Sequence, residues 1–251
     1  MNRVAALIGV FLPALVHSAS FDPSTFVNAT NTINTELVAL VGLGADLHSY
    51  ETSMPHSSKI GADFGPTITA IVLPGSATKA LTDLGVKSIP RAIPLPKFNI
   101  QKAINRRLLI GTEFMPTVKA YGYSFSSWGV NAQFTIINRP RLPPIALRAQ
   151  YNDATLAFVR ARTIGTDLLV TYDLLFIDIY AGGGYRNVQG AVSNPTGTFP
   201  QMSGVDFEPG LDAGHFFGGV STTAGFFRIT AEANFTTRNV STYGAKLSLV
   251  F

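Results

Sequence analysis

The sequence predicts an all-β protein, a transmembrane antiparallel β-barrel of about ten strands (eight to twelve) that follows a short amphipathic helix. Three observations lead to this fold class. Apolar and polar residues alternate with period two in successive segments separated by turn residues, which is the pattern of half-buried strands. Only 14% of the residues are charged, against roughly a quarter in soluble domains. The chain ends in YGAKLSLVF, an apolar strand that would promote aggregation unless other strands paired with it.

Residues 1–20 predict a secretory signal peptide. The stretch MNRVAALIGVFLPALVHSAS has a basic start at Arg3, an apolar run over 4–16 and small residues near its end. That run is too short to cross a bilayer as a helix. We therefore expect the mature protein to begin near Phe21, with a buried first helix as the alternative.

Residues 21–45 predict a short amphipathic helix. Asp22 is a suitable N-cap, Pro23 suits the first turn, and glycines at 42 and 44 end the pattern. The apolar residues at helical spacing are Phe26, Ile33, Leu37, Leu40 and Val41. Such a helix could plug the barrel, lie on the membrane surface or pack between subunits, and the sequence does not decide among these places. A second short helix is expected from Ser76, in the first long loop.

Residues 57–251 predict the barrel itself. The alternation is clearest over 227–236, where every second residue is apolar and each residue between is polar. The expected strands are 57–71, 93–103, 106–116, 126–138, 143–154, 164–173, 175–188, 206–220, 224–237 and 240–251. Short connections alternate with mostly longer ones, as in outer-membrane barrels, whose periplasmic turns are short. A secreted β-sandwich with its apolar face turned inward is the alternative.

Period two assigns the strand residues to a lumen face and a lipid face. The polar residues expected to line the lumen are Lys59, Asp63, Arg107, Glu113, Arg148, Asp178, Arg186, Asp212, Arg228, Glu232 and Lys246. The residues expected to face lipid or another subunit are Phe64, Trp128, Phe134, Tyr151, Phe227, Phe235, Tyr243, Leu249 and Phe251. Because opposite charges in so narrow a barrel would pair, we expect a largely filled lumen. A narrow channel lined by the same residues is the alternative.

Residues suited to chemistry are sparse. The chain has no cysteine, and the histidines of its mature part, His48, His56 and His215, are dispersed. Asp212 and His215 would lie on opposite faces of one strand. We therefore expect no catalytic site, no metal site and no cofactor. The lysines and arginines are scattered, without the basic clusters typical of nucleic-acid binding, so no nucleic-acid partner is expected.

The order of these segments resembles that of the FadL-like outer-membrane barrels. The likeness lies in the signal, the N-terminal helical segment, a first strand near KIGADFGPTITAI, a central SSWGVNAQF strand and the closing YGAKLSLVF. In size and order the chain is similar to the predator outer-membrane proteins, small barrels that form rings around lipid. The chain is much shorter than FadL transporters, so the resemblance does not extend to their hydrophobic ligand pocket.

The resemblance implies a bacterial outer-membrane location, membrane lipids and further copies of the chain as partners, and a non-enzymatic role in holding lipid. We also expect the C-terminal strand to be recognised by the barrel assembly machinery. Small outward residues would let neighbouring barrels approach closely; they are Ala62, Ala132, Ala149, Ala181 and Gly183.

Overall fold

The computed structural model describes residues 31–55, 61–83, 89–120, 123–157, 159–192 and 210–251. Two helices are assigned in these ranges, α3 (Asn31–Gly44) and α4 (Gly75–Asp83). The strands are β1 (Ala62–Val72), β2 (Ala92–Ala103), β3 (Leu108–Ala120), β4 (Tyr123–Ile137), β5 (Ile145–Ala157), β6 (Val159–Leu174), β7 (Ile177–Val192), β8 (Leu211–Ala224), β9 (Phe227–Thr236) and β10 (Ser241–Val250). Within the described ranges, neither helix is long and apolar enough to cross a membrane.

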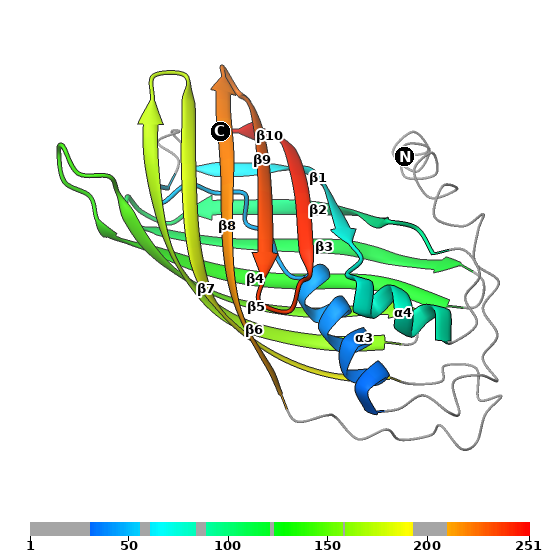
Figure 1. Ribbon diagram of the computed structural model, residues 1–251. Helices are drawn as coiled ribbons and strands as arrows, with labels where there is room; N and C mark the ends of the chain where they lie inside the picture. Colours follow the sequence, from blue (N-terminus) through cyan, green and yellow to red (C-terminus); the bar gives the residue numbers. More distant parts are fainter. Residues whose placement is uncertain (1–30, 56–60, 84–88, 121–122, 158, 193–209) are drawn as a thin grey trace, which may run out of the picture.

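The ten strands form one closed antiparallel barrel in which each strand pairs with its neighbours in the chain and β10 closes onto β1 (Figure 1). The predicted fold class, a ten-stranded antiparallel barrel with a short N-terminal helix, is confirmed. The closing seam pairs Phe64 with Leu249 and Thr67 with Lys246. At its end, the Phe251 amide donates to the Ala62 carbonyl oxygen at 2.8 Å. The apolar last strand therefore has a partner on both sides and presents no free edge.

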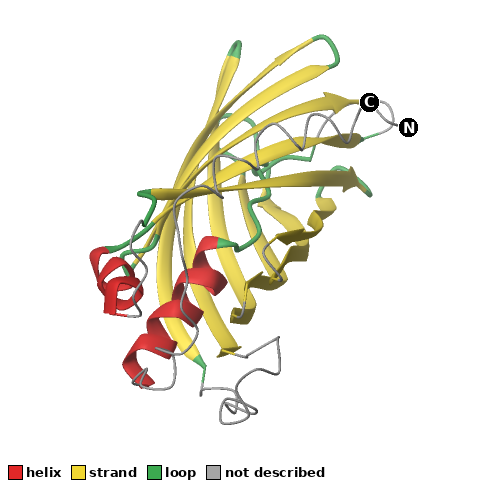
Figure 2. Ribbon diagram, turned by 90° about the vertical axis from the view of Figure 1, so that its right-hand side faces the viewer, coloured by secondary structure: helices red, strands yellow, loops and turns green. Residues whose placement is uncertain are grey.

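The barrel has two different ends, which we call the turn end and the loop end. The turn end carries the connections β2–β3, β4–β5, β6–β7 and β8–β9, together with Phe251. Its tightest turns, at 175–176 and 225–226, use positive φ at Leu175 (52°) and Gly225 (64°). The loop end carries the other connections, and Figure 2 shows both helices at this end.

Helix α3 fills the loop end of the lumen. Its residues from Leu37 to Gly44 are all buried, on every side of the helix. They pack against inward apolar residues of the wall, among them Ile71, Met115 and Val188. A Cβ at Gly42 would overlap the Val188 side chain, so only glycine allows the helix to lie this close to β7. Of the three places left open by the sequence, α3 occupies the lumen.

Residues 45–55, which we call the plug segment, continue from α3 through the lumen towards the turn end, where β1 begins (Figure 1). The plug segment forms neither helix nor strand, and all of it except the half-buried Met54 is buried. The lumen therefore has an apolar part at the loop end, filled by α3, and a polar part filled by the plug segment.

Candidate functional site

The backbone of the plug segment is held by polar side chains of the barrel wall. Carbonyl oxygens accept hydrogen bonds from wall side chains along most of its length, and these pairs are Lys97 and Asn152 with Ala45, Lys97 with Asp46, Gln150 with Leu47, Asn99 with His48, Gln101 with Ser49, Gln133 with Thr52, and Thr135 with Ser53. The Ser53 amide donates to the Thr171 hydroxyl at 2.8 Å. An irregular chain can be buried only when its peptide groups are satisfied in this way. The plug segment is thus an integral part of the lumen.

Asp46, His48 and Glu51 of the plug segment each contact an ionisable side chain of the wall. Asp46 lies 2.6 Å from Arg186. Glu51 contacts Lys246 and Arg228, both at 3.3 Å. The His48 ring is 2.8 Å from the Glu232 carboxylate. Because the Asp46 and Glu51 carboxylates and their cationic partners are buried, removal of either partner of these ion pairs would leave an uncompensated charge.

Further ion pairs connect the wall strands to one another. Lys97 lies 2.8 Å from Glu113, and Lys246 lies 2.8 Å from Asp63. Asp167 is the centre of the largest cluster, where it accepts from Arg148 (2.9 Å), Arg186 (2.6 Å) and His215 (2.8 Å). These contacts, with those of Arg228 and Glu232, involve residues of β1, β2, β3 and β5 to β10. The polar lumen is a network of mixed charges closed by its own pairing.

Tyr50 shows how closely the plug segment and the wall fit. It has a positive φ of 54°, which turns the chain inside the lumen, and its side chain is fully buried. Its hydroxyl lies 2.8 Å from the Thr69 hydroxyl. A Cβ at Gly244 would overlap the Tyr50 ring, so the missing side chain on β10 makes the space that the ring occupies. The strained backbone at Tyr50 is held by this packing.

Several buried polar atoms of the lumen make no hydrogen bond to another described residue, and most of them lie on β2 to β5. Those on β2 to β5 are Gln101 Oε1, Glu113 Oε2, Asn131 Oδ1 and Nδ2, Gln133 Oε1 and Gln150 Oε1, and the others include Asp46 Oδ1, Thr67 Oγ1 and Ser248 Oγ. Asn131 and Gln150 are directly paired across β4 and β5. Such groups commonly bind internal water.

Most of the predicted lumen residues lie in this network. Asp63, Glu113, Arg148, Arg186, Arg228, Glu232 and Lys246 are all buried in the lumen. Asp178 is half-buried near the turn end, 3.9 Å from Arg228. Lys59 lies outside the described residues.

Two of the predicted lumen residues lie elsewhere. Arg107 is exposed in the β2–β3 turn, because β3 begins one residue later, at Leu108. Asp212 is exposed on β8, where the buried residues are Ala213 and His215. Its carboxylate accepts from Asn187 at 2.9 Å.

Asp46, Glu51 and the remainder of the plug segment are lumen residues that the sequence did not indicate as a group. The run ADLHSYETSMP has no period that suits a strand or a helix. The signal it does carry is a change of composition, from the apolar helix before it to polar and ionisable residues.

The outside of the barrel is apolar over its whole circumference. The predicted lipid-facing residues are exposed or half-buried on this surface: Phe64, Trp128, Phe134, Tyr151, Phe227, Phe235, Tyr243, Leu249 and Phe251. Phe64, Phe227 and Phe251 lie near the turn end, while Phe235 and Tyr243 lie near the loop end. Aliphatic residues such as Val130, Leu168 and Ile229 are also exposed. An apolar band with aromatic residues towards both edges is typical of outer-membrane barrels.

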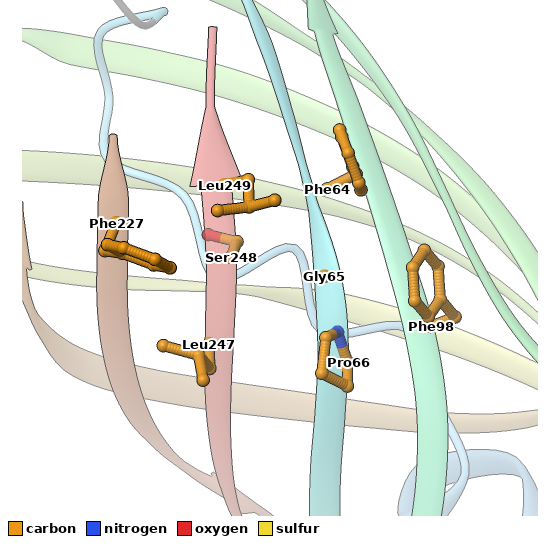
Figure 3. Close-up of a pocket in the computed structure, with 8 residues that line it drawn as sticks. All are labelled: Phe64, Gly65, Pro66, Phe98, Phe227, Leu247, Ser248 and Leu249. Atoms are coloured by element: carbon orange, nitrogen blue, oxygen red, sulfur yellow. The ribbon is translucent and has the colours of Figure 1, made fainter. Parts of the chain in front are cut away.

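A shallow groove crosses the closing seam on this outer surface (Figure 3). Its walls are Phe64, Pro66, Phe98, Phe227, Leu247 and Leu249, with Gly65 and Ser248 between them. The pairing of β1 with β10 skips Gly65 and Pro66, because proline has no amide hydrogen to donate. The groove is therefore an apolar break in the ladder.

No cluster of three or more His, Asp or Glu residues suited to a metal ion occurs within the described part of the chain. The geometry thus provides two features for function, a lumen filled by paired charges and an apolar outer belt. Neither a protein-family model nor a curated protein matches this sequence. The apolar belt suggests an outer-membrane barrel, and the likeness to FadL-like barrels remains a prediction.

Proposed function

We propose that this chain is a non-enzymatic, non-conducting β-barrel of the bacterial outer membrane that assembles as a homo-oligomeric ring and holds membrane lipid. The observation that carries this proposal is the inversion of the barrel: its outside is apolar, while its polar interior is occupied by its own residues 45–55. Residues 45–55 and the buried ion pairs occupy the polar lumen, which favours a barrel that does not conduct solutes. The outer surface is then the part of the molecule available for function.

Rows of small residues on the outer belt support the association of barrels. Ala132 is directly opposite Ala149, on β4 and β5. Ala181, Gly218 and Ala233 form a second row across β7, β8 and β9. Small residues let backbones approach closely within a membrane, where packing contributes most of the association energy. Larger side chains around these rows would contact the acyl chains of lipid held between subunits.

Native mass measurement in mild detergent tests the proposal. We expect the wild-type chain to give one oligomer of defined subunit number with lipid retained. Gly218→Leu should dissociate the oligomer without unfolding the barrel, because a Cβ at Gly218 would meet only the Tyr180 carbonyl oxygen, at 3.7 Å. Val220→Leu, outward on the same strand, is the matched control and should leave the oligomer intact. A monomer without lipid in the wild type would contradict the proposal.

The second candidate function is a narrow passive channel. The unsatisfied polar atoms of β2 to β5 favour it, because a file of internal waters along Gln101, Asn131 and Gln133 could continue between plug segment and wall. Current recordings in planar bilayers separate the two functions. Sustained open-channel current through the wild type would favour the channel, and silence would favour the closed barrel.

A further inference from the structure

We infer that one side of the turn end binds the phosphate-bearing headgroups of anionic glycerophospholipids. This inference rests on the proposed function and specifies the lipid that the barrel would hold. Its residues are Arg106 and Arg107 in the β2–β3 turn, and Arg139 and Arg141 in the β4–β5 turn. All four arginines are exposed.

The two turns are adjacent and rigidly built. The Thr135 amide donates to the Arg107 carbonyl oxygen at 2.8 Å, which joins the first turn to the end of β4 just before the second turn. The Asn105 side chain accepts from the amides of Arg107 (2.8 Å) and Leu108 (2.9 Å). In the second turn, the Leu142 amide donates to the Arg139 carbonyl oxygen at 3.2 Å. The guanidinium groups therefore extend from fixed backbones on one sector of the rim.

These arginines differ from Arg160 and Arg162 at the loop end in having no carboxylate partner among the described residues. At the loop end, Arg160 and Arg162 lie 2.7 Å and 3.2 Å from Asp153. At the turn end, the exposed or half-buried side-chain carboxylates that the structure describes are Asp173 and Asp178, both on the β6–β7 hairpin. Arg106, Arg107, Arg139 and Arg141 thus carry positive charge that no described carboxylate pairs with, and this charge attracts an anion.

The apolar belt extends to these turns and sets the depth of the arginines in a membrane. Ile104 and Leu142, which lie beside the arginines in the two turns, have exposed fractions of 52% and 53%. Apolar side chains at this position would rest at the edge of the hydrocarbon, so the arginines one to three residues away lie at headgroup depth. A guanidinium binds phosphate oxygens through two parallel hydrogen bonds.

The orientation of the barrel selects the lipid. Short turns face the periplasm in outer-membrane barrels, so the turn end would contact the inner, phospholipid leaflet. We therefore commit to a glycerophospholipid with net negative charge, such as phosphatidylglycerol. Each cation near an anionic surface strengthens binding about fivefold. Several arginines on one rim would give a measurable preference over zwitterionic phosphatidylethanolamine.

The test is lipid composition around the full chain in nanodiscs of phosphatidylethanolamine and phosphatidylglycerol at three to one. After release into mild detergent, native mass spectrometry counts each retained lipid. We expect the wild type to enrich phosphatidylglycerol above its bulk ratio. R106Q combined with R139Q should lower that enrichment by about fivefold or more. The charge-preserving pair R106K and R139K should keep most of it.

K79Q combined with R91Q is the matched control, because it removes two exposed positive charges from the loop end. It should leave the enrichment unchanged. Equal enrichment in the wild type and in the R106Q and R139Q variant would overturn the inference. So would a wild type that retains lipid without headgroup preference, an outcome that assigns the arginines to an acidic protein partner. In both outcomes the oligomer and its lipid persist, so the proposed function would stand.

Discussion

Arg186 is the residue on which the charge balance of the lumen depends most directly. It lies 2.6 Å from Asp46 of the plug segment and 2.6 Å from Asp167 of β6, and its side chain is 3% exposed. Arg186→Met would leave both carboxylates with one cationic partner fewer in a buried site. We expect a loss of about 3 to 5 kcal/mol in the free energy of unfolding. Urea unfolding in detergent, followed by tryptophan fluorescence, measures this loss.

Arg160→Met is the matched control for that measurement. Arg160 also lies 2.7 Å from an aspartate, Asp153, but its side chain is 47% exposed. Water screens such a pair, so the expected loss is below about 1 kcal/mol. Equal losses for the two variants would show that the buried network does not stabilise the barrel as described.

At the residue scale, alternation was informative in the middle of strands and uninformative at their ends. Arg148 and Glu232 lie well inside β5 and β9, where period two decides which face a side chain occupies. Arg107 precedes β3, so no period applies to it. Asp212 is the second residue of β8, and it lies on the opposite face of the strand from the buried His215. A shift of one residue at a strand end reverses the face.

The plug segment is the element on which the closed state depends, and its position can be locked. The Ser53 and Thr171 hydroxyl oxygens are 2.6 Å apart, one on the plug segment and the other on β6. Since the chain has no cysteine, Ser53→Cys with Thr171→Cys introduces one possible disulfide. We expect it to form in an oxidising compartment in most molecules, because the side chains already touch. A mobility difference on non-reducing gels measures it.

Thr52→Cys with Thr171→Cys is the matched control, because the Thr52 hydroxyl donates within the plug segment, to the Met54 carbonyl oxygen at 3.1 Å. This pair should remain largely reduced. Equal cross-linking of both pairs would mean that the plug segment moves freely in the lumen, contrary to the hydrogen bonds that hold it.

At the element scale, the strands were predictable and the plug segment was not. Strands repeat every second residue, so short stretches reveal them, although β6 and β7 extend to Val159 and Val192, beyond the predicted 164–173 and 175–188. The plug segment has no period, since its hydrogen bonds go to side chains from distant strands. The amphipathic pattern predicted a helix with one polar, exposed face, whereas α3 is buried on all sides from Leu37 onward.

At the scale of the whole molecule, the chain runs through its own barrel before it forms the wall. Helix α3 and Phe251 therefore lie at opposite ends of the barrel. Helix α3 lies at the loop end, the plug segment crosses the lumen, and β1 starts at the turn end beside Phe251. Antiparallel closure was predictable from the strand pattern. This threading was not, because it depends on how the inner surface of the completed barrel matches residues 45–55.

The threading predicts on which side of the membrane each segment is exposed. Epitope tags inserted directly before Asn31 and in the β9–β10 connection after Arg238 should both be labelled by antibody on intact cells, because both places lie at the loop end. A tag in the β2–β3 turn after Asn105 should be labelled only after the outer membrane is permeabilised, because short turns face the periplasm. The β2–β3 tag also serves as the control for membrane integrity. If the tag before Asn31 were accessible only together with the β2–β3 tag, the chain would not cross the lumen in the membrane, and both the plug segment and the closed barrel would have to be abandoned.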